Sequence, residues 1–256
     1  MKLKLKYKRE MKMNFNDREK IIALTPLWNG ERLPDGRPKV EDKYLDALYG
    51  MTLEEVWKPI FVLGYEHQFV GGGENPLNTL HDDGRKLVGR AVTCTYCPTR
   101  PDLHDVQFAR GAEDGLQGNY NQWVIDHLYE RDVVVCDMYD KIYKGTFLGG
   151  NLTTALHNRT KTGGAVIWGG IRDVEQMKKV PDVQVYYRGI DPTPIREFVM
   201  KDWNDITNFG GAVCLPGDIV FGAGGGVLFI PAHLVADVVE GAAKTHVKDD
   251  FGFEMI

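Results

Sequence analysis

The sequence predicts an α/β domain, because strand and helix patterns alternate through its middle and a hairpin pattern follows them. Short apolar runs indicate buried strands, whereas apolar residues that recur at helical spacing indicate amphipathic helices. The alternating elements are expected at strand 87–97, helix 119–130, strand 132–140, helix 151–162, strand 164–170 and strand 183–189.

The N-terminal part of the chain is polar and helix-biased. Residues 39–60 carry its best amphipathic pattern, with Tyr44, Leu45 and Leu48 at helical spacing. Residues 64–86 are interrupted by Gly, Asn and Pro, which is typical of a loop. We therefore expect helical structure ahead of the first long strand.

The C-terminal part combines a hairpin with a closing helix. Residues 218–231 indicate two strands around the GAGGG turn, and residues 231–247 keep apolar residues on one helical face before an acid-rich tail. This organisation predicts an N-terminal helical extension over 1–60, an α/β core over 61–240 and a C-terminal tail over 241–256.

The composition is that of an ordinary globular protein, with 43% hydrophobic and 26% charged residues. The formal net charge of −5 argues against a general affinity for nucleic acid or anionic membranes. The basic start, MKLKLKYKREMK, has no apolar segment behind it and does not resemble a secretory signal. No stretch approaches the ~20 apolar residues of a membrane helix. We expect a cytoplasmic protein without a nucleic-acid or membrane partner.

The cysteine pattern favours a structural role. Cys94 and Cys97 form a CxxC, but no second pair follows at the spacing of a zinc site. The motif also lies inside a strand pattern rather than at a strand-to-helix turn. We therefore expect the cysteines to act as small apolar residues in the sheet.

The stretch WGGIRD places Arg172 and Asp173 side by side directly after a strand. The helix beginning near Asn151 also follows a glycine pair, and asparagine is a favourable N-cap residue. A helix start offers free amides, here those of Leu152 and Thr153, to an anion such as a carboxylate. Since the helix and the following strand bring the chain back on itself, we expect the Arg-Asp pair beside these amides.

This arrangement suits a 2-keto acid. The planar fork of Arg172 can hold a carboxylate and the adjacent keto oxygen. Asp173 can bind Mg²⁺ or Mn²⁺, because such ions need few protein carboxylates when water and substrate oxygens complete their coordination. Together these groups would stabilise the enolate that forms when a neighbouring carbon–carbon bond breaks. The alternative is a solvated turn whose local ion pair contributes under ~1 kcal/mol.

Six segments share their order and spacing with one known family. They are VGRAVT (88–93), DVVVCD (132–137), GGNLTTAL (149–156), GGAVIWGGIRD (163–173), VYYRGIDPTP (185–194) and PGDIVFGAGGGVLFIP (216–231). From about residue 85 to 240 the chain thus resembles the RraA-like family. This family includes the metal-dependent 4-hydroxy-4-methyl-2-oxoglutarate/4-carboxy-4-hydroxy-2-oxoadipate aldolases and the RraA regulators of ribonuclease E. The resemblance implies a swivelling β/β/α domain, assembled as a homotrimer or homohexamer with sites between subunits.

The resemblance also implies roles for individual residues. Arg172 and Asp173 match the family's substrate-binding arginine and metal-binding aspartate, and the segment Gly150–Thr153 matches its substrate-binding helix start. Asn151 stands where the aldolases carry an acid, so it can orient a metal-bound water but cannot take a proton.

The family further takes an acidic residue from the C-terminal segment of a neighbouring subunit. Asp249 and Asp250 are the nearest candidates here, with Glu254 behind them. His246 is a further candidate proton carrier.

These features predict a divalent-metal-dependent lyase that cleaves a carbon–carbon bond next to a 2-keto acid, either an aldolase or an oxaloacetate-type decarboxylase. Arg172, Asp173, Asn151 and an acid at Asp249 or Asp250 would carry the reaction, with Mg²⁺ or Mn²⁺ as the cofactor. Two alternatives stay open. One is a metal-dependent dehydratase or hydratase of a sugar-derived acid, and the other is a non-catalytic binding protein like the RraA regulators.

Overall fold

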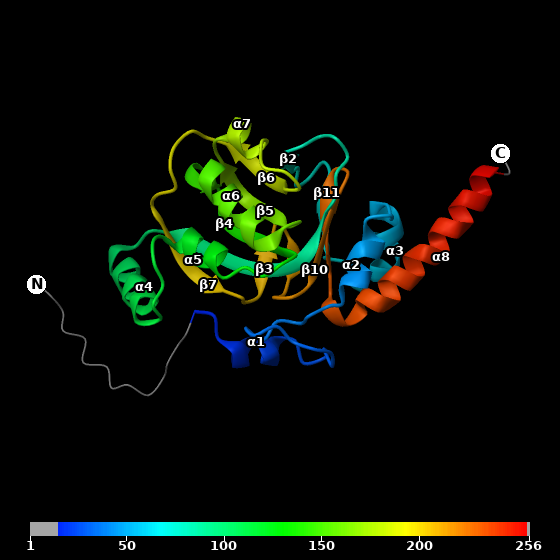
Figure 1. Ribbon diagram of the computed structural model, residues 1–256, viewed down its shortest axis with the longest axis horizontal. Helices are drawn as coiled ribbons and strands as arrows, with labels where there is room; N and C mark the ends of the chain where they lie inside the picture. Colours follow the sequence, from blue (N-terminus) through cyan, green and yellow to red (C-terminus); the bar gives the residue numbers. More distant parts are fainter. Residues whose placement is uncertain (1–14, 255–256) are drawn as a thin grey trace, which may run out of the picture.

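The structure is a computed structural model that describes residues 15–254, with side chains described for residues 15–246. It has a mixed α/β fold, and helices precede the first strand (Figure 1). These helices are α1 (Arg18–Leu24), α2 (Asp42–Leu48) and α3 (Leu53–Val62). The predicted fold class and the predicted helices ahead of the sheet are confirmed.

Parallel strands form the centre of the main sheet. They are β3 (Leu87–Pro98), β4 (Asp132–Leu148), β5 (Gly164–Ile171) and β6 (Gln184–Ile190). Because these strands run in one direction, the chain leaves all of them at the same edge of the sheet, which is where open α/β folds bind ligands. The segments that carry the expected site therefore meet at this edge.

Antiparallel strands complete the sheet on both sides. In the described chain the order is β1-β11-β10-β3-β4-β5-β6-β2, and β7 pairs separately with β3. The added strands are β1 (Phe69–Gly71), β2 (Asn78–Thr79), β7 (Phe198–Trp203), β10 (Ile219–Ala223) and β11 (Gly226–Ile230). β8 (Thr207–Phe209) and β9 (Ala212–Cys214) form a separate hairpin.

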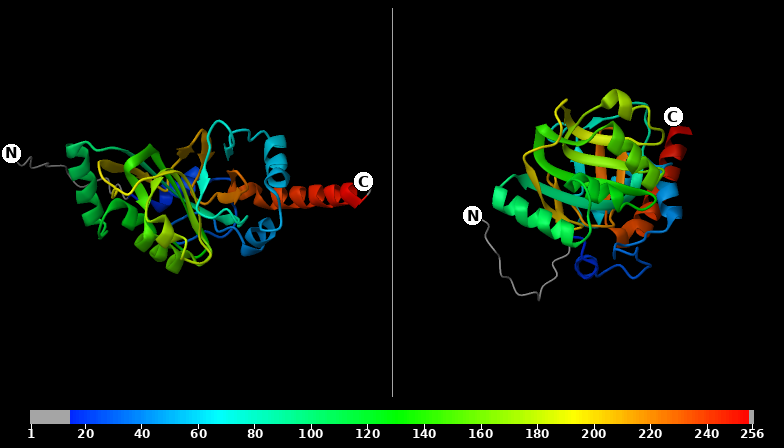
Figure 2. Two further views of the ribbon diagram at one scale, coloured as in Figure 1. Left: turned by 90° about the horizontal axis from the view of Figure 1, so that it is seen from above. Right: turned by 60° about the vertical axis from the view of Figure 1, so that its left-hand side comes forward.

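Helices lie against the sheet in two groups (Figure 1). One group consists of α4 (Pro101–Glu113), α5 (Tyr120–Asp126), α6 (Gly150–Thr160) and α7 (Val174–Met177). The other group packs α2 and α3 against α8 (Val235–Glu254), which follows the short 3-10 helix η1 (Ala232–Leu234). The C-terminal end of α8 projects away from the sheet (Figure 2). Among the described residues no helix is both long and apolar enough to cross a bilayer.

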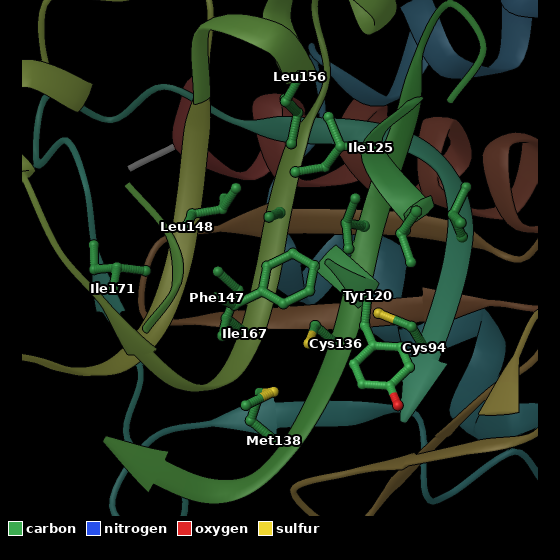
Figure 3. Close-up of a cluster of buried hydrophobic side chains, with 14 of the residues drawn as sticks. Cys94, Tyr120, Ile125, Cys136, Met138, Phe147, Leu148, Leu156, Ile167 and Ile171 are labelled. Atoms are coloured by element: carbon green, nitrogen blue, oxygen red, sulfur yellow. The ribbon is translucent and has the colours of Figure 1, made fainter. Parts of the chain in front are cut away.

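Alternating side chains of the central strands build cores on both faces of the sheet. Val134 of β4 belongs to the cluster under α5 and α6, whereas its neighbour Val133 belongs to the cluster on the other face. Figure 3 shows part of the first cluster, where Leu156 of α6 and Ile167 of β5 are fully buried. Each such side chain contributes about 1.5–3 kcal/mol by leaving water. This packing holds α6 against the sheet and so fixes where its first turn lies.

A buried ion pair joins the N-terminal segment to the parallel strands. The Arg37 side chain is fully buried, and its Nη1 and Nη2 donate to the two carboxylate oxygens of Asp132, at 3.0 and 2.7 Å. Its Nε donates to Asp35 at 2.7 Å, and Nη1 also donates to the carbonyl of Ala91 at 3.2 Å. The described part of the extension, residues 15–60, is therefore anchored to the sheet through Arg37.

The four cysteines behave as expected. All are free, and Cys94, Cys136 and Cys214 are buried while Cys97 is partly exposed. Burial raises the pKa of Cys214 well above its usual range, which makes this thiol unreactive. As expected, the CxxC of Cys94 and Cys97 lies within a strand, β3.

Several expected boundaries are wrong. The single amphipathic stretch over 39–60 is two helices, α2 and α3, separated around Gly50. The strand expected to end at residue 140 continues to Leu148, with register shifts and left-handed residues such as Tyr139 and Lys144 that bend it. The closing helix runs to Glu254 instead of giving way to a tail near residue 247. That segment holds no proline, and its charged residues are compatible with a helix.

Candidate active site

The candidate site lies where β4 and β5 end. β4 ends at Leu148 and α6 begins at Gly150, while β5 ends at Ile171 and the next two residues are Arg172 and Asp173. The amide of Arg172 donates to the carbonyl of Leu148 over 3.0 Å. The Arg-Asp pair therefore lies beside the start of α6, as expected.

The glycine pair at the start of α6 allows this close approach. A Cβ on Gly149 would lie 2.6 Å from Oδ2 of Asp173 and 3.0 Å from Nε of Arg172. A Cβ on Gly150 would lie 2.4 Å from Oε1 of Gln176. Any larger residue at Gly149 would push the two charged side chains away, so the glycine is part of the site's geometry.

Asp173 is held in an unusual backbone conformation. Its φ of +57° and ψ of 35° are left-handed, a region that aspartate tolerates better than most residues. Its carbonyl accepts from the amides of Gln176 and Met177, at 2.9 Å each, which starts α7. Its carboxylate Oδ2 accepts from the amide of Gly150 at 3.2 Å and lies 3.6 Å from Nε of Arg172. The turn thus aims the carboxylate at the start of α6.

Both charged side chains stay accessible. The Arg172 side chain is 39% exposed and that of Asp173 is 36% exposed. The ion pair between them therefore contributes little to stability. Among the described residues no hydrogen bond reaches the second carboxylate oxygen of Asp173 or the terminal nitrogens of Arg172. These atoms are free to contact a ligand.

The start of α6 corrects two expectations. Gly149, in an extended conformation, is the N-cap, so Asn151 is the second residue of the helix and not its cap. The Asn151 side chain is exposed and makes no hydrogen bond to a described residue. The amide of Thr153 donates to the carbonyl of Gly149 at 3.0 Å, and the Thr153 side chain is buried. Thr153 therefore cannot offer its amide to substrate, because it already makes the first hydrogen bond of the helix.

Two amides remain open at this helix start. Those of Asn151 and Leu152 have no acceptor among the described residues, while the amide of Gly150 is used by Asp173. Open amides in a first helical turn attract anions through their partial positive charge. A carboxylate bound there would lie beside Arg172.

Sequence reasoning missed two polar residues near the site. Gln176, three residues after Asp173, has its amide oxygen close to Gly150. Asp191 follows β6 and its amide donates to the carbonyl of Ile171 at 3.1 Å, so it lies at the same sheet edge. The sequence did indicate this position, because Asp191 directly follows β6, which is parallel to β5.

The expected C-terminal acids lie outside the described side chains. Asp249, Asp250 and Glu254 belong to the backbone of α8, but the description of side chains ends at residue 246. The ring of His246 lies 2.8 Å from the carboxylate of Glu55, which is largely buried on α3. His246 therefore links α8 to α3 within the chain.

The donor set fits a hydrated magnesium-type ion and not a zinc site. Among the described side chains no three His, Cys, Asp or Glu residues converge as metal ligands. Mg²⁺ is often held by only one or two protein carboxylates, with water and substrate oxygens completing its shell. The accessible carboxylate of Asp173, next to a glycine pair that keeps the space clear, meets that requirement.

The fold and this site place the protein among α/β proteins that carry an Arg-Asp pair beside an open helix start. The chain belongs to the RraA-like family, since a family model described as Aldolase/RraA matches residues 63–229. The family includes 4-hydroxy-4-methyl-2-oxoglutarate/4-carboxy-4-hydroxy-2-oxoadipate aldolases and RraA regulators, so membership alone does not choose between catalysis and regulation.

Individual relatives are distant. Protein DlpA of Legionella pneumophila is 31% identical over 158 residues, which are 61% of this chain and 23% of that protein. The chain thus spans less than a quarter of the length of that curated relative.

Solved structures share the fold. Streptomyces coelicolor RraAS2, described as an unusual member of the RNase ES inhibitor RraA family, is 20% identical with a TM-score of 0.65, covering 87% of this chain and 98% of that one. A protein described among novel cellulases from gut-associated microbes is 19% identical with a TM-score of 0.69, covering 87% and 90%. An uncharacterised protein from Pseudomonas syringae is 18% identical with a TM-score of 0.65, covering 86% and 91%.

Proposed function

We propose that this protein is a divalent-metal-dependent lyase that cleaves a carbon–carbon bond next to a 2-keto acid and releases pyruvate or a similar fragment. The observation that carries the proposal is the approach of Arg172 and Asp173 to the glycine pair at the start of α6. Membership of a family that includes metal-dependent aldolases supports the same chemistry.

Substrate binding uses two kinds of donor. The guanidinium of Arg172 holds the carboxylate and the adjacent keto oxygen through its planar fork. The open amides of Asn151 and Leu152 complete the anion site at the helix start. The same arginine stabilises the negative charge that moves onto the keto oxygen when the carbon–carbon bond breaks, and this electrostatic effect is the main catalytic contribution.

Asp173 would hold the cation. When bound, Mg²⁺ or Mn²⁺ supplies positive charge that favours the enolate. The hydrogen bond from Gly150 fixes one carboxylate oxygen of Asp173 and leaves the other for the ion. Asn151 and Gln176, with neutral amide oxygens nearby, would orient water in the surrounding shell.

Asn151 favours decarboxylation over aldol cleavage. Aldol cleavage requires a base that removes the proton of the substrate hydroxyl, whereas loss of CO₂ from a keto acid such as oxaloacetate requires none. Asn151 is exposed at the helix start, and its amide cannot accept that proton. An oxaloacetate-type decarboxylase is therefore the form of the proposal that the described residues support best.

The proposal includes a homotrimer or homohexamer. α8 leads away from the edge of the sheet that carries Arg172, so Asp249 and Asp250 would serve a neighbouring copy and not their own chain (Figure 2). On α3 the stacked rings of Trp57 and Phe61, with centroids 4.6 Å apart, remain 36% and 44% exposed. Exposed apolar patches of this kind are typical of protein interfaces.

The test measures pyruvate release from oxaloacetate and from 4-hydroxy-2-oxo acids with added Mg²⁺. Arg172→Ala is expected to lower kcat/KM by a factor of about 10²–10³, as for loss of an oxyanion-stabilising donor. Arg159→Ala, on the exposed far end of α6, is the matched control and should retain full activity. Equal rates in wild type and Arg172→Ala would refute the role given to Arg172.

A second experiment tests the shared site. Mixing subunits of Arg172→Ala with subunits of the double variant Asp249→Asn/Asp250→Asn should restore part of the aldol activity, because some mixed sites would be intact. Full activity of the double variant alone would remove the C-terminal acids from the site, and failure of mixed oligomers to recover any activity would contradict a site shared between subunits. A protein without turnover that instead captures a partner would support the regulatory alternative.

A further inference from the structure

A cavity lies between the N-terminal segment and the turns that precede β10 and follow β11. It has a volume of about 280 Å³, just below the range of small-molecule pockets, which is roughly 300–1,000 Å³. Residues Leu24 to Trp28 and Pro38 line one side, and Leu215, Asp218 and residues 231–233 line the other. None of the residues from 148 to 176 contributes, so this cavity is distinct from the site at Arg172.

The cavity is built by contact between the extension and the turn before β10. A Cβ on Gly217, whose φ is +89°, would lie 2.4 Å from Cδ of Pro38. Leu27, in the cavity wall, remains 62% exposed, which leaves a way in from solvent. The matched family region begins at residue 63, so the side of the cavity formed by Leu24 to Trp28 and Pro38 belongs to a segment outside that match.

A buried acid without a cationic partner faces this cavity. Asp218 is only 4% exposed, and its two carboxylate oxygens accept from the amides of Leu215 at 2.8 Å and Ala232 at 3.3 Å. Among the described residues no basic side chain forms an ion pair with it. A carboxylate offers about four acceptor positions, so two remain open. Burial of an uncompensated charge is costly and raises the pKa of Asp218 to about 7.

The remaining walls are mostly apolar or aromatic, with Thr25 and Gln68 as further polar residues. Trp28 and Tyr65 line the cavity, and no lysine or arginine among the described residues does. The indole of Trp28 is fixed because its Nε1 donates to the carbonyl of Glu31 at 2.8 Å. Tyr65 pairs with His233 across 3.4 Å, and burial lowers the pKa of His233, which favours its neutral form at pH 7. Aromatic walls beside a carboxylate attract organic cations and repel anions.

We propose that this cavity binds a small organic ammonium ion with an apolar body, whose charge pairs with the carboxylate of Asp218 between Trp28 and Tyr65. The ligand supplies the positive charge that none of the described residues places beside this buried acid. The site is independent of the lyase reaction proposed above, so either proposal can fail alone.

The test is calorimetric titration of the full chain with benzylammonium, cyclohexylammonium and tetramethylammonium. Benzyl alcohol and benzoate serve as the neutral and anionic counterparts of the first probe. At least one ammonium ion is expected to bind ten times more tightly than benzyl alcohol, and benzoate should not bind. Binding should tighten as the pH rises from 6 to 8, since the cation favours the ionised form of Asp218.

Two variants test whether the ammonium ion binds in the cavity and not elsewhere on the surface. Asp218→Asn and Trp28→Leu should each weaken ammonium binding at least tenfold, and Trp28→Leu leaves the hydrogen bonds of Asp218 in place. Asp237→Asn, an exposed acid on α8, is the control and should bind like wild type. Failure of all three ammonium ions to bind, equal binding of benzylammonium and benzyl alcohol, or full binding by Trp28→Leu would overturn the proposal and leave Asp218 as a turn-stabilising residue only.

Discussion

The carboxylate of Asp173 accepts a hydrogen bond from the amide of Gly150, with 3.2 Å between Oδ2 and N. This bond joins the turn after β5 to the first residue of α6. It also replaces the side-chain cap that α6 lacks, since its N-cap is a glycine. A negative charge at this position is favourable to the helix by about 0.3–1 kcal/mol. This hydrogen bond therefore holds Asp173, the candidate metal ligand, beside the open amides of Asn151 and Leu152.

Gly149→Ala should damage the site without unfolding the protein. The new methyl group would lie 2.6 Å from Asp173 Oδ2 and 3.0 Å from Arg172 Nε, and both side chains are exposed enough to move aside. We expect kcat/KM for pyruvate release to fall at least tenfold while the Tm changes by only a few degrees. Gly73→Ala, where a Cβ meets nothing within 4 Å, is the control. Unchanged activity in Gly149→Ala would show that the two charged groups need not lie against the helix start.

Asn151→Asp should shift the reaction toward aldol cleavage. The new carboxylate would supply the proton acceptor that the exposed amide cannot provide. The ratio of aldol cleavage to oxaloacetate decarboxylation, measured with Mg²⁺, should rise at least tenfold. Asn158→Asp, farther along the same helix, should leave the ratio unchanged. The same ratio in wild type and Asn151→Asp would mean that residue 151 does not control the proton.

Arg37→Met should destabilise the fold strongly. It leaves Asp132 buried with no cationic partner, and loss of one member of a buried ion pair costs about 3–5 kcal/mol. Urea denaturation measures the free energy of unfolding. The exposed pair of Arg18 and Glu19 provides the comparison, because Arg18→Met should cost under about 1 kcal/mol. Similar losses in both variants would show that the extension is not anchored through Arg37.

Asp218 makes stability depend on pH in an identifiable window. Burial raises its folded-state pKa to about 7, above the value of 3.8 for an ordinary aspartate. Between these values the unfolded chain loses its proton first, so this group lowers the stability of the fold as the pH rises from 4 to 7. The loss is on the order of 4 kcal/mol.

Urea titrations of wild type and Asp218→Asn at pH 4, 5.5, 7 and 8 measure this effect. The free energy of unfolding of Asp218→Asn should rise relative to that of wild type as the pH rises to 7, and the difference should then stay constant. A difference that stays constant over this range would mean that Asp218 is ionised in the fold throughout.

Much of the site could be predicted because it follows from the direction of the strands. Parallel β4 and β5 place the residues after Leu148 and Ile171 at one edge, so Arg172 was correctly expected beside the start of α6. The N-cap of α6 could not be predicted from residue preference, because asparagine is a favourable N-cap residue and yet Gly149 takes that position. The assignment of Thr153 failed with it, since moving the cap by two residues places that amide inside the helix.

Other parts of the fold have weak sequence signals. α4 was missed because it buries little apolar surface, and its buried residues are Gln107 and Gly111. The strand predicted over 132–140 was too short, because left-handed residues at Tyr139, Asp140 and Lys144 break the alternation of a regular strand in β4. Asp218 was not recognised as a buried acid, because its position depends on the extension folding over the turn before β10.

The most direct test of the account is the binding of oxalate, a planar mimic of the pyruvate enolate, measured by calorimetry with and without Mg²⁺. Wild type should bind oxalate only when Mg²⁺ is present, and Arg172→Ala and Asp173→Asn should each bind it at least ten times more weakly. Oxalate binding that is equal in all three proteins, or unaffected by a chelator, would contradict a metal-assisted enolate site at Arg172 and Asp173.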